Sequence, residues 1–188
     1  MASPRSLLDL TVKDWFGELA DSRGVPGGGS ALAFVASTAA SVLAMIARVS
    51  EQPGLAAQAE QLRARTAPLA QLDADTYEAA LMAPDTTEGL KPEQRDWAIG
   101  RAFAAAAEPP LEIARAGADL AELAAVLAEN GDPRVRADAL VAARLALAVV
   151  LGAGELVSVN LTALEGDPRV AEADDLATRA TQSLSRVH

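Results

Sequence analysis

The feature that most constrains the fold is an apolar run from Ala31 to Ala47, whose only polar side chains are three hydroxyls, Ser37, Thr38 and Ser41. A helix that is apolar all round is buried on all sides. The run therefore predicts the central, buried helix of a helical domain, around which the other helices pack.

A glycine-rich turn, Val25-Pro26-Gly27-Gly28-Gly29-Ser30, directly precedes this run. Consecutive glycines allow positive φ values or close approach of another group to the backbone. We expect Ser30 to be the N-cap of the helix, with the free N–H groups of its first turn directed at a bound group. A glycine-rich connection that binds no ligand is the alternative interpretation, because a glycine pattern is a weak signal by itself.

The rest of the chain has helical rather than strand periodicity, so we expect an all-α fold of about six helices in a single domain over residues 1–188. The predicted helices beside 31–47 cover 11–20, 55–82 with a bend at Pro68, 92–129 with a break or kink at Pro109-Pro110, 133–164 and 167–186. We expect a capping box at Thr11, a buried face of Trp15, Phe16 and Leu19, and a polar loop from Pro84 to Leu90. The sequence Gly-Asp-Pro-Arg-Val occurs at 131–135 and 166–170, where Asp would cap the next helix and Pro would occupy its first turn.

Composition removes several classes of chemistry. The chain has no cysteine, and its one histidine, His188, is the last residue. Histidine bases, thiolate nucleophiles and metal sites made of these ligands are therefore excluded, and we expect no metal. The formal net charge of −10 argues against a nucleic-acid partner. The apolar run lacks a basic flank on its N-terminal side, so we expect no membrane span and a cytoplasmic protein.

Four polar residues are candidates for chemistry. Asp73 and Tyr77 are four residues apart and share a helix face, although a solvated acidic patch is the alternative. Asp138 has Val141, Ala142 and Leu145 as helical neighbours, where a carboxylate needs a partner. Asn160 lies among Leu156, Val157 and Leu161, as either a ligand-binding or a structural amide.

These motifs, in this order, resemble the cyclodeaminase/methenyltetrahydrofolate cyclohydrolase family, which includes the C-terminal domain of formiminotransferase-cyclodeaminase. The resemblance covers nearly the whole chain. It is carried by the PGGGS turn and small-residue helix, Asp73 and Tyr77, Pro110-Leu111-Glu112-Ile113-Ala114, Asp138, and Val159-Asn160-Leu161.

The resemblance implies an all-helical fold, two-fold assembly and a tetrahydrofolate derivative as substrate. The implied reactions are cyclodeamination of 5-formiminotetrahydrofolate and hydrolysis of 5,10-methenyltetrahydrofolate to the 10-formyl compound. Positioned carboxylates can transfer the protons that either reaction needs. Asp138 and Asp73 are the expected catalytic residues, and the expected substrate-binding residues are Pro26, Gly27, Gly28, Gly29, Ser30, Tyr77 and Asn160.

Three positions depart from the family pattern: Leu156 replaces an amide, Asp85 a basic residue, and Asp132 the Asn of a Gly-Asn pair. Two alternatives therefore stay open. One is an enzyme of this fold that acts on a non-folate amidine or imine. The other is a non-catalytic helical dimer that binds a ligand or partner.

Asp138 and Asn160 are 22 residues apart in sequence on one predicted helix, which places them roughly 33 Å apart along its axis. One ligand cannot easily touch both in a straight helix. We expect the stripe of Ala142, Leu145, Val149, Gly152 and Leu156 to pack against its own copy. Such a homodimer would bring Asp138 of one chain nearer to Asn160 of the other than to its own.

Overall fold

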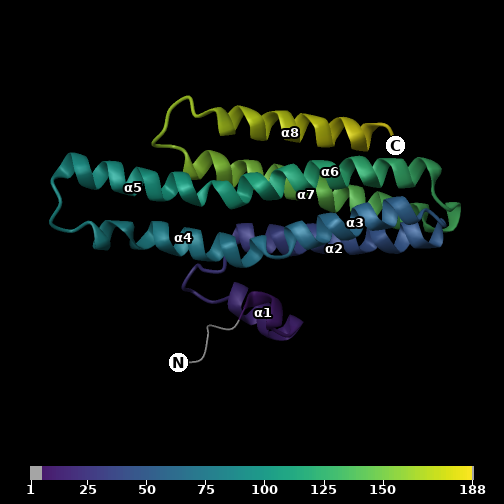
Figure 1. Ribbon diagram of the computed structural model, residues 1–188, viewed down its shortest axis with the longest axis horizontal. Coiled ribbons are helices and arrows are strands. Elements are labelled where there is room, and N and C mark those ends of the chain that lie inside the picture. The colour runs from purple at the N-terminus through teal and green to yellow at the C-terminus, as the bar shows by residue number, and fades with distance from the viewer. Residues whose placement is uncertain (1–5, 188) are drawn as a thin grey trace.

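The computed structural model describes residues 6–187, and every regular element in that range is helical (Figure 1). His188 lies outside the described residues. The all-α prediction is confirmed. In chain order the helices are α1 (Val12–Leu19), α2 (Gly28–Val49), α3 (Pro53–Thr66), α4 (Leu69–Thr86), α5 (Pro92–Ala106), α6 (Glu108–Asn130), α7 (Arg136–Asn160) and α8 (Pro168–Ser185), with short 3₁₀ helices η1 (Leu7–Asp9) and η2 (Pro133–Val135).

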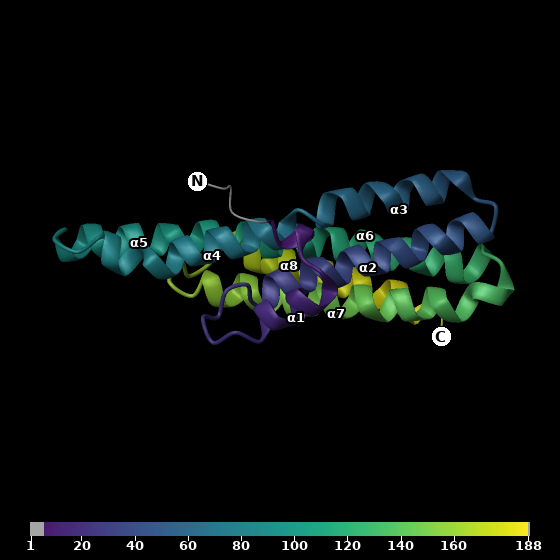
Figure 2. The same ribbon diagram turned by 90° about the horizontal axis from the view of Figure 1, so that it is seen from below.

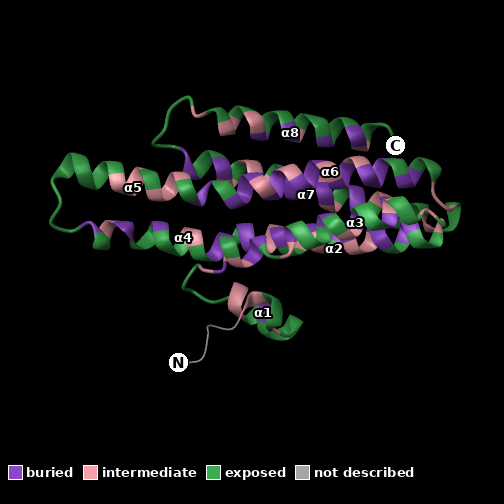
Figure 3. Ribbon diagram, in the orientation of Figure 1, coloured by how far each residue is buried: buried purple, intermediate pink, exposed green. Residues whose placement is uncertain are grey.

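Small side chains let the core helices approach closely. A Cβ atom placed on Gly117 of α6 would lie 2.7 Å from Cγ2 of Val150 on α7, so glycine is required at this contact. Figure 3 shows the buried faces of α2, α6 and α7, on which alanine is the commonest buried residue. A core built from alanine and glycine places helix backbones near one another, which is how a chain with few aromatic residues fills its interior.

The helix at 31–47 is part of this core, but only one side of it is enclosed. Ala33, Ala36 and Leu43 are buried, whereas Phe34 and Met45 on the opposite side are partly exposed. Among the described helices, α6 is instead buried around most of its circumference, because α2, α3, α7 and α8 all pack against it.

The segments Gly28–Val49 and Pro133–Asn160 are long and apolar enough to cross a membrane by length and composition alone. Core helices meet the same criterion, and 50% and 39% of their most apolar stretches are buried inside the bundle.

Several helix ends differ from the predictions. α2 begins at Gly28 with Gly27 as its N-cap, so the prediction that Ser30 caps this helix was wrong. The predicted helix 55–82 is two helices, because Pro68 separates α3 from α4. α4 then continues through Pro84 to Thr86, where we expected a loop. Phe16 is 61% exposed rather than buried, while Trp15 is buried and stacks on Phe34.

The other three predicted caps, Thr11, Asp132 and Asp167, are confirmed. Thr11 accepts a hydrogen bond from the backbone N–H of Asp14 at the start of α1. In the two Gly-Asp-Pro-Arg-Val segments, Asp132 and Asp167 accept from the backbone N–H groups of Arg134 and Arg169. Each aspartate thus satisfies an N–H group that the following helical turn leaves without a partner.

The second half of α4 and most of α5 form an arm that extends beyond the other helices (Figures 1 and 2). The two helices pack against each other along this arm, so α4 belongs to the bundle at one end and to the arm at the other. The root of the arm adjoins the glycine-rich turn that starts α2, and this junction holds most of the candidate residues.

Candidate active site

A cavity of about 200 Å³ lies where the N-terminus of α2 meets α4, α6 and α7. The three consecutive glycines, Asp73, Tyr77 and Asn160 all line it, as the order of motifs suggested. The full lining is Gly24, Gly27, Gly28, Gly29, Asp73, Tyr77, Pro110, Leu156, Val159 and Asn160.

Gly29 lets the Asp73 carboxyl approach the backbone at the start of α2. A Cβ atom on Gly29 would lie 2.6 Å from Oδ2 of Asp73 and closer still to Oδ1, so no other residue can occupy position 29 without moving the carboxyl. The neighbouring Gly28 has more room, because a Cβ there would meet only the Leu156 side chain, at 3.8 Å. The glycine turn therefore makes room for a side chain of the protein itself at Gly29.

Asp73 is 7% exposed and carries the only carboxyl group in the lining of the cavity. Among the described residues no lysine or arginine nitrogen forms an ion pair with it. Burial is the largest influence on its pKa and raises it above the ordinary value, while hydrogen bonds from the hydroxyl and the backbone N–H of Ser30 act in the opposite direction. A carboxyl group with a raised pKa is suited to proton transfer near neutral pH.

Two expected substrate contacts do not line the cavity. Ser30 is fully buried, and its Oγ lies 2.7 Å from the carbonyl oxygen of Ala70 and 3.1 Å from Oδ2 of Asp73. The Ser30 hydroxyl therefore does not line the cavity, because α4 covers it, and direct substrate binding by Ser30 stays a prediction. Pro26 is also buried, and it follows a cis peptide bond in the turn beside the cavity.

Tyr77 on α4 and Asn160 on α7 both line the cavity. Tyr77 is one helical turn after Asp73 and partly exposed. The side-chain amide of Asn160 donates from Nδ2 to the carbonyl oxygen of Ala106, 3.0 Å away at the end of α5. This hydrogen bond is the structural role that we considered for Asn160, and it fixes the plane of the amide while Asn160 also lines the cavity.

A second cavity, of about 310 Å³, adjoins the first and shares Val159 and Asn160 with it. Its other lining residues are Asp96, Ile99, Gly100, Phe103, Thr162 and Ala163. The four residues from α5 follow helical spacing on one face, a signal in the sequence that we did not interpret. Among them Phe103 offers an aromatic ring and Asp96 a carboxylate.

Residues 11–179 match the family model described as formiminotransferase-cyclodeaminase. The chain belongs to the formiminotransferase-cyclodeaminase family. Comparison with curated proteins gives no significant match. Among solved structures, the fold is similar to the crystal structure of formiminotetrahydrofolate cyclodeaminase from Thermotoga maritima, with a TM-score of 0.84 and 23% sequence identity over 97% of this chain and 96% of that one.

Asp138, the other expected catalytic residue, lies far from this cavity. It lies in the first turn of α7, whereas Asn160 is the last residue of the same helix, which continues without a break through Gly152 and Gly154. Asp138 is exposed and so is its neighbour Val141, whereas Ala142 and Leu145 pack against the core. Within one chain the two expected catalytic carboxylates therefore do not meet.

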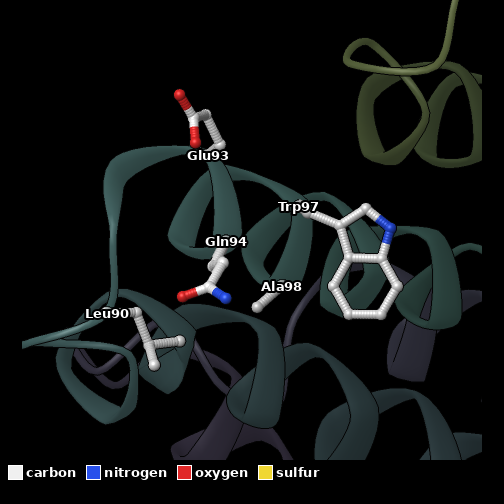
Figure 4. A pocket seen from close by; sticks show the side chains of 5 residues that line it. All are labelled: Leu90, Glu93, Gln94, Trp97 and Ala98. Atoms are coloured by element: carbon white, nitrogen blue, oxygen red, sulfur yellow. The ribbon is translucent and has the colours of Figure 1, made fainter.

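A further cavity, of about 580 Å³, lies near the free end of the arm and is lined by Leu90, Glu93, Gln94, Trp97 and Ala98 (Figure 4). It contains none of the residues that carry the family resemblance. Among residues 6–187, no three histidine, cysteine, aspartate or glutamate side chains are grouped so that they could hold a metal ion. We therefore place the candidate active site at the glycine turn.

Proposed function

We propose that this chain is a tetrahydrofolate one-carbon enzyme that cyclodeaminates 5-formiminotetrahydrofolate to 5,10-methenyltetrahydrofolate and ammonia. The observation that carries the proposal is the position of Asp73, a buried carboxyl group in a cavity formed by the family's glycine turn, Tyr77 and Asn160. Hydrolysis of the methenyl compound to 10-formyltetrahydrofolate is the second reaction that the same groups support.

The reaction needs proton transfer and no redox step. The N10 nitrogen of the substrate attacks the formimino carbon and forms a C–N bond, and its own proton moves to the former imine nitrogen. The bond from carbon to that nitrogen then breaks, and the nitrogen leaves as ammonia after receiving one further proton from an acid. Asp73 is the group that we assign to deliver it, because general acids of this kind act with a raised pKa.

The two adjoining cavities provide places for the ring systems of such a substrate. Tyr77 lines the inner cavity and Phe103 the outer one, so each offers an aromatic face for stacking. Asn160 belongs to both, and its Oδ1 can accept a hydrogen bond while Nδ2 is held by Ala106. Backbone N–H groups at the start of α2 can contact a polar group of the ligand.

The lining also favours a second candidate, an enzyme of this fold acting on a smaller, non-folate amidine. Leu156 lines the cavity in place of the family's amide, and Asp96 in the outer cavity repels the anionic tail that a folate carries. Asp85, in the arm, stands where the family has a basic residue. Melting-temperature shifts with tetrahydrofolate derivatives and with small amidines distinguish the two candidates.

We further propose that the active assembly is a cytoplasmic homodimer formed through the outer faces of α2 and α7. The predicted stripe cannot serve for this contact, because Gly152 packs on Leu32 and Ala142 and Val149 are buried within the chain. The neighbouring face of α7 carries exposed Val141, Leu151 and Val159 instead. An antiparallel contact centred near Ala148 would place Asp138 of one chain beside Asn160 of the other.

The test of the proposed function is a direct assay. Purified protein is incubated with 5-formiminotetrahydrofolate, while formation of the methenyl compound is followed by its near-ultraviolet absorbance and ammonia is measured separately. We expect both products at equal rates, with a fall of about 10²- to 10⁴-fold in Asp73→Asn. The matched control is Asp75→Asn, since Asp75 is exposed on the same helix. No acceleration of either reaction over buffer would overturn the proposal.

A further inference from the structure

The hydrogen-bonding geometry around Ser30 bears on the protonation state of Asp73. The Ser30 hydroxyl oxygen has two oxygen neighbours, the Ala70 carbonyl at 2.7 Å and Oδ2 of Asp73 at 3.1 Å, and water does not reach it because Ser30 is fully buried. A hydroxyl carries one proton, so it can donate only one full hydrogen bond. A carbonyl oxygen can only accept. The shorter contact, to Ala70, therefore takes the Ser30 proton.

We propose that Asp73 rests as a protonated acid, with its proton on Oδ2 donated to Ser30 Oγ, and that Ser30 is a positioning residue that holds this acid ready. Once the Ser30 proton is directed at Ala70, the side of Oγ that faces Asp73 is a lone pair. An ionised carboxylate there would set two acceptors against each other in a buried site, whereas a protonated carboxyl supplies the missing donor. The inference rests on the proposed function for its chemistry, but the proton assignment itself does not depend on the substrate.

The surroundings of Asp73 agree with a neutral carboxyl. The side chain is buried, and α2 carries no charged residue before Arg48. Two contacts would favour the ionised form: a hydrogen bond donated by the Ser30 hydroxyl, which the proposed direction replaces, and one from the Ser30 backbone N–H at the start of α2. Tyr77 is the other titratable side chain that lines the cavity. Charged side chains on the nearby elements include Asp9 on η1, Asp96 on α5 and Glu155 on α7. They also include three sets of ion pairs: Arg23 with Glu18 and Asp21, Glu108 with Arg169, and Glu112 with Arg65 and Arg115.

A resting acid separates the two candidate reactions. Ammonia release needs a proton donor for the departing nitrogen, which a protonated Asp73 supplies directly, leaving a carboxylate that regains its proton from solvent. Hydrolysis of the methenyl cation begins instead with removal of a proton from the attacking water, for which a protonated carboxyl is too weak a base. The cation would also meet a neutral group rather than a compensating charge. The geometry thus favours cyclodeamination.

The pH dependence of the Ser30→Ala variant tests the direction of this hydrogen bond. If Ser30 accepts from Asp73, its removal destabilises the protonated form, so the loss of kcat/KM at high pH should move to lower pH by about one unit. A shift to higher pH would overturn the proposal, because it would mean that Ser30 donates to a carboxylate. Ser37→Ala is the matched control, since the Ser37 hydroxyl likewise donates to a backbone carbonyl, that of Ala33 within α2, and lies away from the cavity.

A spectroscopic measurement on the substrate-free protein keeps the inference testable even if Ser30→Ala does not fold. Infrared difference spectra or carboxyl-carbon NMR at neutral pH should show one protonated carboxyl group that is absent in Asp73→Asn and present in Asp75→Asn. Finding Asp73 ionised at that pH would overturn the proton assignment whatever the activity. A protonated Asp73 in a protein that acts on neither folate compound would instead leave the assignment standing and overturn only the proposed function.

Discussion

Gly28 and Gly29 are consecutive residues at the start of α2, but a side chain at each would meet different surroundings. A Cβ at position 29 would overlap the Asp73 carboxyl, whereas one at position 28 would make an ordinary contact with Leu156. We expect Gly29→Ala to lower the melting temperature and abolish activity, because the carboxyl must move away from Ser30. Gly28→Ala, the matched control, should fold normally. Equal behaviour of the two variants would contradict this account of the turn.

The raised pKa of Asp73 predicts how stability changes with pH. The folded chain holds this proton more tightly than the unfolded chain, so the contribution of Asp73 to stability is greatest below about pH 3.9 and decreases as pH rises through the folded pKa. Asp73→Asn removes the titration. The melting temperature of the variant should therefore rise relative to the parent as the pH increases above about 4, as measured by calorimetry, and a falling difference would show that the pKa is lowered instead.

At the scale of single residues, the sequence predicted which residues lie near one another but not where each side chain points. The glycines, Asp73, Tyr77 and Asn160 share one cavity because each motif marks a helix end or face that the fold brings to the same junction. The contacts of the Ser30 hydroxyl could not be predicted, because its partners lie on α4, forty residues away, which no local pattern reveals. The α5 residues, including Phe103, do follow helical spacing in the sequence, but that pattern does not reveal which helix or cavity they face.

At the scale of elements, α8 is started by Asp167, whose carboxyl accepts from the backbone and side chain of Arg169. These hydrogen bonds hold the pKa of Asp167 at about 2, below its ordinary value. The stabilisation is complete above about pH 4 and is lost as pH falls through about 2. Asp167→Asn should thus lower the melting temperature at pH 7, with a difference that shrinks toward pH 2. The control is Glu165→Gln, an exposed carboxylate just before the cap, which should show no such trend.

The apolar periodicity predicted where the helices form, whereas two helix boundaries near prolines were predicted wrongly. Pro68 was expected to bend a helix but separates two, with Thr66 as the last residue of α3. Pro84 was expected to lie in a loop, yet α4 continues through it. The tertiary contact of α4 with α5 extends that helix, and such a contact outweighs the local preference of one residue.

At the scale of the whole molecule, the proposed dimer predicts different effects for substitutions at two exposed leucines. Leu151 is 49% exposed on the outer face of α7, and Leu81 is 45% exposed on the arm. Leu151→Glu should convert the protein from dimer to monomer by light scattering, because it places a charge in an apolar contact, whereas Leu81→Glu should not. A parent protein that is monomeric at micromolar concentration would contradict the dimer.

The sequence could not separate a core face from an outer face when both are apolar. α2 and α7 have buried and exposed apolar sides, so the apolar pattern predicted enclosure for α2 and a self-packing stripe on α7 that in fact lies inside the chain. Asp138 was placed in an apolar setting for this reason, and its exposure follows from the same ambiguity. Its catalytic role, like the single-domain organisation, stays a prediction.

The two tryptophans lie in opposite environments, so their intrinsic fluorescence reports on two separate parts of the protein. Trp15 is buried against Phe34, whereas Trp97 is 65% exposed on the arm, with the Arg101 guanidinium 5.1 Å from the centre of its ring. Their emission therefore differs in wavelength and in access to dissolved quenchers. Global unfolding will be read mainly from the red shift of Trp15 emission, and changes at the arm from the quenching of Trp97, without any attached label.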